Sequence, residues 1–201
     1  MNFRSILAGA LLGALAFFAV RLALARPEAP PHFHANFAVF VDGRRVDLTG
    51  GQYSEEVASC RLTGQALQPQ ERVHLHNRDP DVAHVHHAGV TWGHLFANLG
   101  FGLGGSYMAT DQGSILADGA GKTLKFVVNG RLATSVHNVL IASGDRLLVS
   151  YGAENAAEVL AKQFPAVASD APQFNERPDP AGCSGAVEPT FWDRLRHAAI
   201  G

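Results

Sequence analysis

The chain has 201 residues, of which 47% are hydrophobic and 17% are charged, and its formal net charge is −2 at pH 7. This length and composition suit one domain of ordinary size with extensions. A net charge this close to zero gives no basic field, so we expect no nucleic-acid partner.

The first 25 residues are predicted to form an export signal or a membrane anchor, with a buried helix of a soluble protein as the alternative. Arg4 is followed by the uncharged run 5–20 and then by Arg21. An apolar run of this length behind a positive start is typical of both kinds of segment. Ala23-Leu24-Ala25 offers an A-x-A cleavage site, whereas an uncleaved anchor needs Arg21 to snorkel to the interface. Both interpretations place residues 32–201 in the cell envelope, facing the periplasm or exterior, or secreted if the signal is cleaved.

The segment 26–31 is a Pro-rich spacer, and residues 32–152 form a β-rich domain. Residues 32–48 alternate in polarity around Asp42-Gly43, which is a short hairpin signal. A second hairpin is predicted from strands 72–77 and 82–89, because Asp79-Pro80-Asp81 between them consists of residues that favour a turn. A short helix follows over 89–100, with Thr91 as its N-cap and Gly100 at its end.

In the rest of the β-rich domain and in the C-terminal part, turn and cap residues again mark where the predicted elements begin and end. Residues 102–122 are predicted to be a Gly-rich loop, 124–134 a hairpin around Asn129-Gly130, and 145–152 the last strand. In the C-terminal part, 153–201, a helix is predicted over 155–164, stopped by Pro165. It is followed by an irregular segment 165–189 and a short helix capped by Thr190.

Two cysteines, Cys60 and Cys183, are present. In an exported protein they are expected to form one disulfide, which would tie the C-terminal tail back to the domain. Two unpaired thiols, or thiols recruited to a metal, are the alternatives.

These elements predict an α+β fold: a mixed or antiparallel sheet built from hairpins, with one helix packed across it. The stretches "GVTWGHLFANLG", "LKFVVNGR" and "LIASGDRLLVSYG" resemble the second half of a β-grasp domain. That resemblance implies a histidine hairpin inserted between the first hairpin and the helix. The chain also resembles an uncharacterised group of membrane-anchored, His-rich prokaryotic envelope proteins, through "HFHANFAVFVDG", "VHLHNRDPDVAHVHHAGVTWGHLFANLGF" and a late Cys-containing tail. This resemblance implies export and no particular activity.

Histidine spacing is the main functional signal. Because side chains at i and i+2 of a strand share a face, each H-x-H pair points two imidazoles the same way. A hairpin symmetric about Pro80 would place His76 opposite His84 and His74 opposite His86. If the first strand lies beside this hairpin, the predicted metal ligands are His74, His76, His84, His86, His32 and His34.

Two further histidines are additional candidates. His87 points away or sits at a bulge. His94 lies in the first turn of the helix, where the dipole favours the neutral, ligating form. Asp79 and Asp81 are turn residues or acceptors for the ligating imidazoles.

Imidazole clusters of this kind suit copper or zinc as the bound ion. The alternatives are a solvated histidine face or a pH-sensitive interface. Three functions follow: an anchored metal-binding module, a metalloenzyme with an open His-ligated position, or an interaction subunit of a membrane protein assembly. The sequence contains no G-x-S-x-G, C-x-x-C or H-E-x-x-H motif, and it leaves open whether the protein is an enzyme.

Overall fold

The computed structural model describes residues 2–25, 31–55, 72–177 and 190–200. The chain divides into two units, Met1–Ala29 with Ala186–Gly201, and Pro30–Gly185. Cys60, Cys183 and nearly all of the predicted spacer lie outside the described residues, and so does the predicted disulfide.

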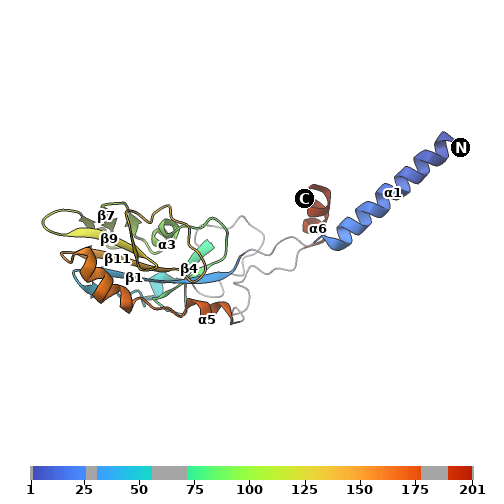
Figure 1. Ribbon diagram of the computed structural model, residues 1–201. Helices are drawn as coiled ribbons and strands as arrows, with labels where there is room; N and C mark the ends of the chain where they lie inside the picture. Colours follow the sequence, from blue (N-terminus) through green and yellow to red (C-terminus); the bar gives the residue numbers. More distant parts are fainter. Residues whose placement is uncertain (1, 26–30, 56–71, 178–189, 201) are drawn as a thin grey trace. The chain divides into compact units, whose positions relative to one another are not determined.

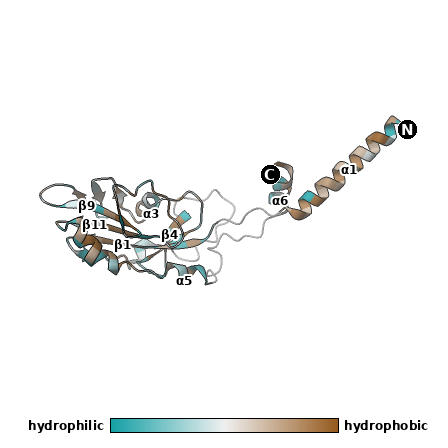
Figure 2. Cartoon of the chain, in the orientation of Figure 1, coloured by the Kyte–Doolittle hydropathy of each residue, from teal (hydrophilic) through white to brown (hydrophobic). Residues whose placement is uncertain are grey.

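The first unit contains the N-terminal apolar helix α1 (Phe3–Leu24) and the C-terminal helix α6 (Phe191–Ile200). At 1.5 Å per residue, 22 residues of α1 reach about 33 Å, which matches the hydrocarbon core of a bilayer. Its length and apolar surface therefore suit a membrane span, and a signal sequence would meet the same criterion (Figure 2). Thr190 caps α6 as predicted, because its hydroxyl accepts a hydrogen bond from the Asp193 backbone N–H.

The second unit is built on a mixed sheet, as predicted (Figure 1). Among the described residues its strand order is β10-β9-β11-β1-β5-β4-β3, with β2 paired to β1. The β1–β11 and β3–β4 pairs are parallel, and the others are antiparallel. The strands are β1 (Phe33–Val41), β2 (Arg44–Arg45), β3 (Ser54–Glu55), β4 (Val73–His76), β5 (Val82–Val85), β9 (Thr123–Val128), β10 (Arg131–Ala133) and β11 (Arg146–Gly152).

Two of the predicted hairpin turns have the backbone that their residues favour. Asp42 and Gly43 have φ of 50° and 72°, and Asn129 and Gly130 have φ of 50° and 79°. Positive φ at both central residues is the type I′ geometry, which matches the twist of the flanking strands. The β1–β2 and β9–β10 hairpins are therefore fixed locally.

Helix α3 (Trp92–Asn98) covers one face of the sheet, and Thr91 caps it as predicted. Alternate residues of β1 divide between the two faces. Ala35, Phe37 and Val39 pack into the same core as Trp92, whereas Ala38 and Phe40 belong to a smaller apolar cluster with Val127, Leu148, Val159 and Val167. Figure 1 shows α3 and α5 on opposite sides of the sheet. The even-numbered residues of β1, which include His34, therefore face away from α3.

The Gly-rich loop predicted over 102–122 instead contains a second, small sheet. Its strands are β6 (Gly102–Leu103), β7 (Tyr107–Ala109) and β8 (Ile115–Ala117), paired antiparallel in that order. The prediction was wrong because strands of two or three residues carry no measurable alternation, while the intervening Gly and Asp residues supply strong turn signals.

The segment after β11 also differs from its prediction. The capping box of Asn155 and Glu158 starts a helix as predicted, but only Ala156–Glu158 (α4) is α-helical, followed by a π-helical turn, Val159–Gln163. A 3₁₀ turn, Phe164–Ala166, continues past Pro165 because proline is tolerated in a first turn. A further helix, α5 (Ala171–Asn175), lies in a region that was predicted to be irregular.

Candidate metal centre

Three adjacent strands bring the predicted histidines onto one face of the sheet. β5 lies between β1 and β4, and His84 of β5 is paired with His34 on one side and His74 on the other. The expectation that the first strand lies beside the histidine hairpin is therefore confirmed. Since the period of a strand is two, His32, His76 and His86 extend this row on the same face.

The hairpin register differs from the predicted one by two residues. His74 is paired with His84, whereas symmetry about Pro80 had placed His76 there. The turn begins earlier, because Asn77 and Arg78 have φ of 56° and 57° and the Asp79 backbone N–H donates to the His76 carbonyl over 2.9 Å. A two-residue shift leaves every side chain on its own face, so the common histidine face survives this correction.

The imidazole rings are in direct contact. The His86 ring stacks between those of His32 and His74, with centroids 4.9 Å from each. The His76 ring meets His84 edge-on at 4.5 Å, and His34 meets His84 at 4.3 Å. The six predicted ligands therefore form one contiguous patch of rings.

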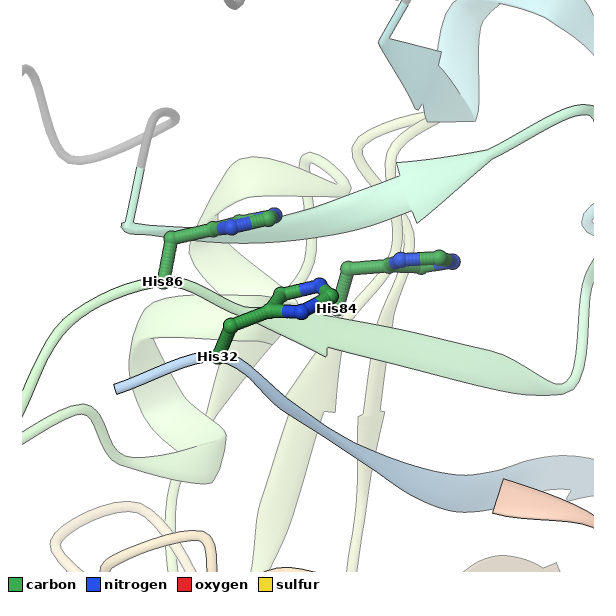
Figure 3. Close-up of side chains that lie close together, drawn as sticks. All are labelled: His32, His84 and His86. Atoms are coloured by element: carbon green, nitrogen blue, oxygen red, sulfur yellow. The ribbon is translucent and has the colours of Figure 1, made fainter. Parts of the chain in front are cut away.

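Two groups of three histidines have the spacing of a metal site. The outer group is His32, His84 and His86, and the inner group is His74, His76 and His86. Within each group the candidate nitrogens lie within 4.8 Å of one another. Figure 3 shows the outer group, with His84 on β5, His86 directly after β5, and His32 directly before β1. All members are buried except His32, which is partly exposed.

The inner group is close to a coordination geometry. The Nε2 atoms of His74 and His76 are 2.9 Å apart. Two nitrogens bound to one tetrahedral zinc at 2.0–2.1 Å lie about 3.3 Å apart. A metal ion could replace this hydrogen bond after small side-chain rotations, once the donating ring has moved its proton from Nε2 to Nδ1.

His34 belongs to neither group and instead positions His84. Asn175 Oδ1 lies 2.8 Å from the His34 backbone nitrogen, which can only donate, so this Asn175 atom is an acceptor. The same oxygen lies 2.7 Å from His34 Nδ1, which must therefore carry a hydrogen. In a neutral His34, Nε2 then accepts from His84 Nδ1 over 2.9 Å, and the bare nitrogen of His84 is Nε2. Hydrogen bonds of this kind fix the tautomer of a metal-ligating histidine.

Burial keeps His84 and His86 neutral. Removal from water, with the neighbouring His34 and His76 imidazoles as further causes, lowers the pKa of His84 far below its usual value. Burial, followed by His74 and His32, lowers the pKa of His86 to about 2. Both rings are therefore neutral at physiological pH, which is the form that binds metal ions.

His86 is a buried polar side chain without a hydrogen bond. It is 4% exposed, and neither of its ring nitrogens has a hydrogen-bond partner among the described residues. A buried polar group normally costs free energy unless it is paired, so an unpaired imidazole at the centre of a histidine patch points to a missing ligand.

The remaining candidates lie outside both groups. His87 Nδ1 lies 2.6 Å from the Ala88 carbonyl. His94 is exposed on α3, at the opposite face, where its Nδ1 accepts from the Thr91 backbone N–H. Asp79 accepts from the Asp81 backbone N–H over 3.0 Å, as a turn residue does, and the Asp81 carboxylate pairs with Arg45.

Two asparagines that the sequence analysis did not single out hold α5 against the histidine face. Asn36, fully buried in β1, accepts from the Ala171 backbone N–H over 2.8 Å and donates to Asp170 over 2.8 Å. Asn175, at the other end of α5, holds His34. The signal for Asn36 was available, since an amide on the buried face of an apolar strand requires hydrogen-bond partners. Asn175 carries no comparable signal.

Comparisons with known proteins give no family for this chain. It matches no protein-family model, no curated protein and no solved structure. Its resemblance to His-rich envelope proteins stays a prediction, and the function has to be argued from the histidine face itself.

Proposed function

We propose that this chain is an exported, membrane-anchored metal-binding protein that holds a copper or zinc ion among His32, His74, His76, His84 and His86, with His34 positioning His84. The observation that carries the proposal is the unpaired, buried His86 ring, which completes both groups of three imidazoles. The functions that fit are sequestering, sensing or delivering the ion.

The ligand chemistry supports copper or zinc. Both groups consist of imidazoles alone among the described residues, and imidazole nitrogen suits borderline ions, with affinity highest for Cu²⁺ in the divalent series. Hard ions such as Mg²⁺ and Ca²⁺ prefer oxygen ligands. A group of three histidines with a water molecule in the fourth position is a common arrangement for zinc.

Helix α1 supports the anchored location. It would hold the metal-binding domain in the cell envelope, at the periplasmic or outer face of the membrane, or would serve as a signal whose removal releases the domain.

A metalloenzyme is the second candidate, because each group of three imidazoles leaves a fourth coordination position for water or substrate. Spectroscopy of the loaded protein separates the two candidates. A site saturated by four protein ligands supports a binding protein, whereas an exchangeable water ligand supports the enzyme.

The test is elemental analysis of the full chain after export and mild purification, followed by competition titration with copper and with zinc. We expect one of these ions to bind to the natural sequence and to be lost from the His74→Ala/His86→Ala variant. The matched control is His87→Ala, which removes the neighbouring histidine that lies outside both groups. Natural protein that binds neither ion better than the double variant would refute the proposal.

A further inference from the structure

The two histidine groups share one member, and this suggests how an ion could move. His86 belongs to the outer group and to the inner group, and its ring lies 4.9 Å from both His32 and His74. An ion bound to His86 could therefore exchange His32 and His84 for His74 and His76 without leaving the protein.

The two groups differ in their access to solvent. All three members of the inner group are buried, and His76 is fully inaccessible. The outer group contains His32, which is partly exposed and immediately precedes β1. An ion arriving from solvent therefore meets the outer group first, while the inner group offers the drier position.

Charge limits the centre to one ion at a time. Neither group includes a carboxylate or thiolate among the described residues, so every ligand is neutral. Two divalent ions would place four positive charges in a buried site with no compensating anion, and the repulsion between them is strong where water is excluded. The shared ligand would also have to serve both ions.

We propose that the outer group is the entry and exit position for the ion and the inner group its holding position, with His86 bound to the ion throughout the transfer. This inference rests on the proposed metal-binding function. The transfer is a ligand exchange: the bonds to His32 and His84 break as those to His74 and His76 form. All ligands stay neutral: the inner imidazole that donated the Nε2 hydrogen bond takes its Nδ1–H form as the ion binds and returns to its Nε2–H form as the ion leaves, and no electron is moved.

The experiment uses the full chain in detergent, loaded with Zn²⁺, and measures three quantities: the number of ions bound, the affinity by chelator competition, and the rate of zinc transfer to a chromophoric chelator. His32→Ala is expected to slow uptake and release about tenfold while changing the dissociation constant less than about threefold. His76→Ala is expected to weaken the dissociation constant by about tenfold or more without slowing the transfer. His87→Ala is the control and is expected to behave as the natural sequence does.

The outcomes are distinct. One ion per chain, with the rate effect at His32 and the affinity effect at His76, supports the transfer. Two ions per chain, or equal losses of affinity in the two variants at unchanged rates, overturn it while leaving metal binding intact. Absence of zinc and copper binding by the natural sequence overturns both proposals. Circular dichroism of the metal-free variants checks folding, and His32→Gln and His76→Gln repeat the measurements if an alanine variant does not fold.

Discussion

Acidification should destabilise the metal-free protein well before its carboxyl groups titrate. The perturbation is a change from pH 8 to pH 5 with a chelator present. His84 and His86 are buried, and burial together with the neighbouring imidazoles lowers the pKa of both far below the value of 6.5 that they have when unfolded. The unfolded chain therefore takes up two protons in this range that the folded chain does not.

The sign and the magnitude follow from proton linkage. Because the unfolded state binds more protons below pH 6.5, the free energy of unfolding falls as the pH falls. Each histidine approaches a slope of about 1.4 kcal/mol per pH unit, which integrates to about 2 kcal/mol between pH 8 and pH 5. The two together remove about 4 kcal/mol, a large part of the 5–15 kcal/mol that is typical of a domain.

The assay is urea unfolding of metal-free protein at several pH values, followed by circular dichroism. Above pH 5 the change in the free energy of unfolding comes mainly from histidines, since unperturbed carboxyl groups titrate near pH 4. In His86→Gln, which cannot titrate, the slope should fall by about 1.4 kcal/mol per pH unit. His87→Gln is the control and should keep the slope of the natural sequence. A free energy of unfolding that stays level between pH 8 and pH 5 would refute the reasoning.

Three further changes test the contacts around the site. Asn175→Ala removes the acceptor that holds His34, so metal affinity should fall about tenfold in a competition titration, whereas Gln173→Ala on the same helix should leave it unchanged. Asn36→Ala removes the partner of the buried Ala171 backbone N–H and of the half-buried Asp170 carboxylate, and should lower the free energy of unfolding by about 3 kcal/mol, measured with urea; a loss below about 0.5 kcal/mol would contradict the assigned hydrogen bonds. Trp92→Ala should cost about 3–5 kcal/mol in the same assay, because the indole at the start of α3 is fully buried in the core beside Phe37, and an unchanged stability would contradict that packing.

The two faces of β1 explain why a histidine cluster can be built into this sheet. The face toward α3 is apolar and includes Phe37 and Val39, and it carries the hydrophobic stabilisation of the second unit. The other face changes along the strand from the imidazole of His34, through the amide of Asn36, to the apolar Ala38 and Phe40. The polar half is covered by α5, whose ends are held by hydrogen bonds. Hydrogen bonds therefore hold this polar half together, while the main hydrophobic core lies on the opposite face of the sheet, beneath α3.

Much of the candidate site could be predicted because strand geometry is local. The period of two places His74 with His76 and His84 with His86 whatever the rest of the chain does, and it made the common face insensitive to the two-residue error in register. The hairpins at Asp42-Gly43 and Asn129-Gly130 were also predictable, because their turns need positive φ.

The sequence by itself determined the apolar N-terminal helix, the α+β class and the pairing of histidines along each strand, since all three follow from local pattern. Only the tertiary structure decided which histidines form a group. The order of strands in the sheet places β5 between β1 and β4. His86, directly after β5, therefore belongs to both groups, and His34 of β1 positions His84. Helix α5 and Asn175 reach the site from about 140 positions away in sequence, as the separation of 141 between His34 and Asn175 records. Contacts at that distance leave no periodicity to find, because they depend on how the whole sheet packs.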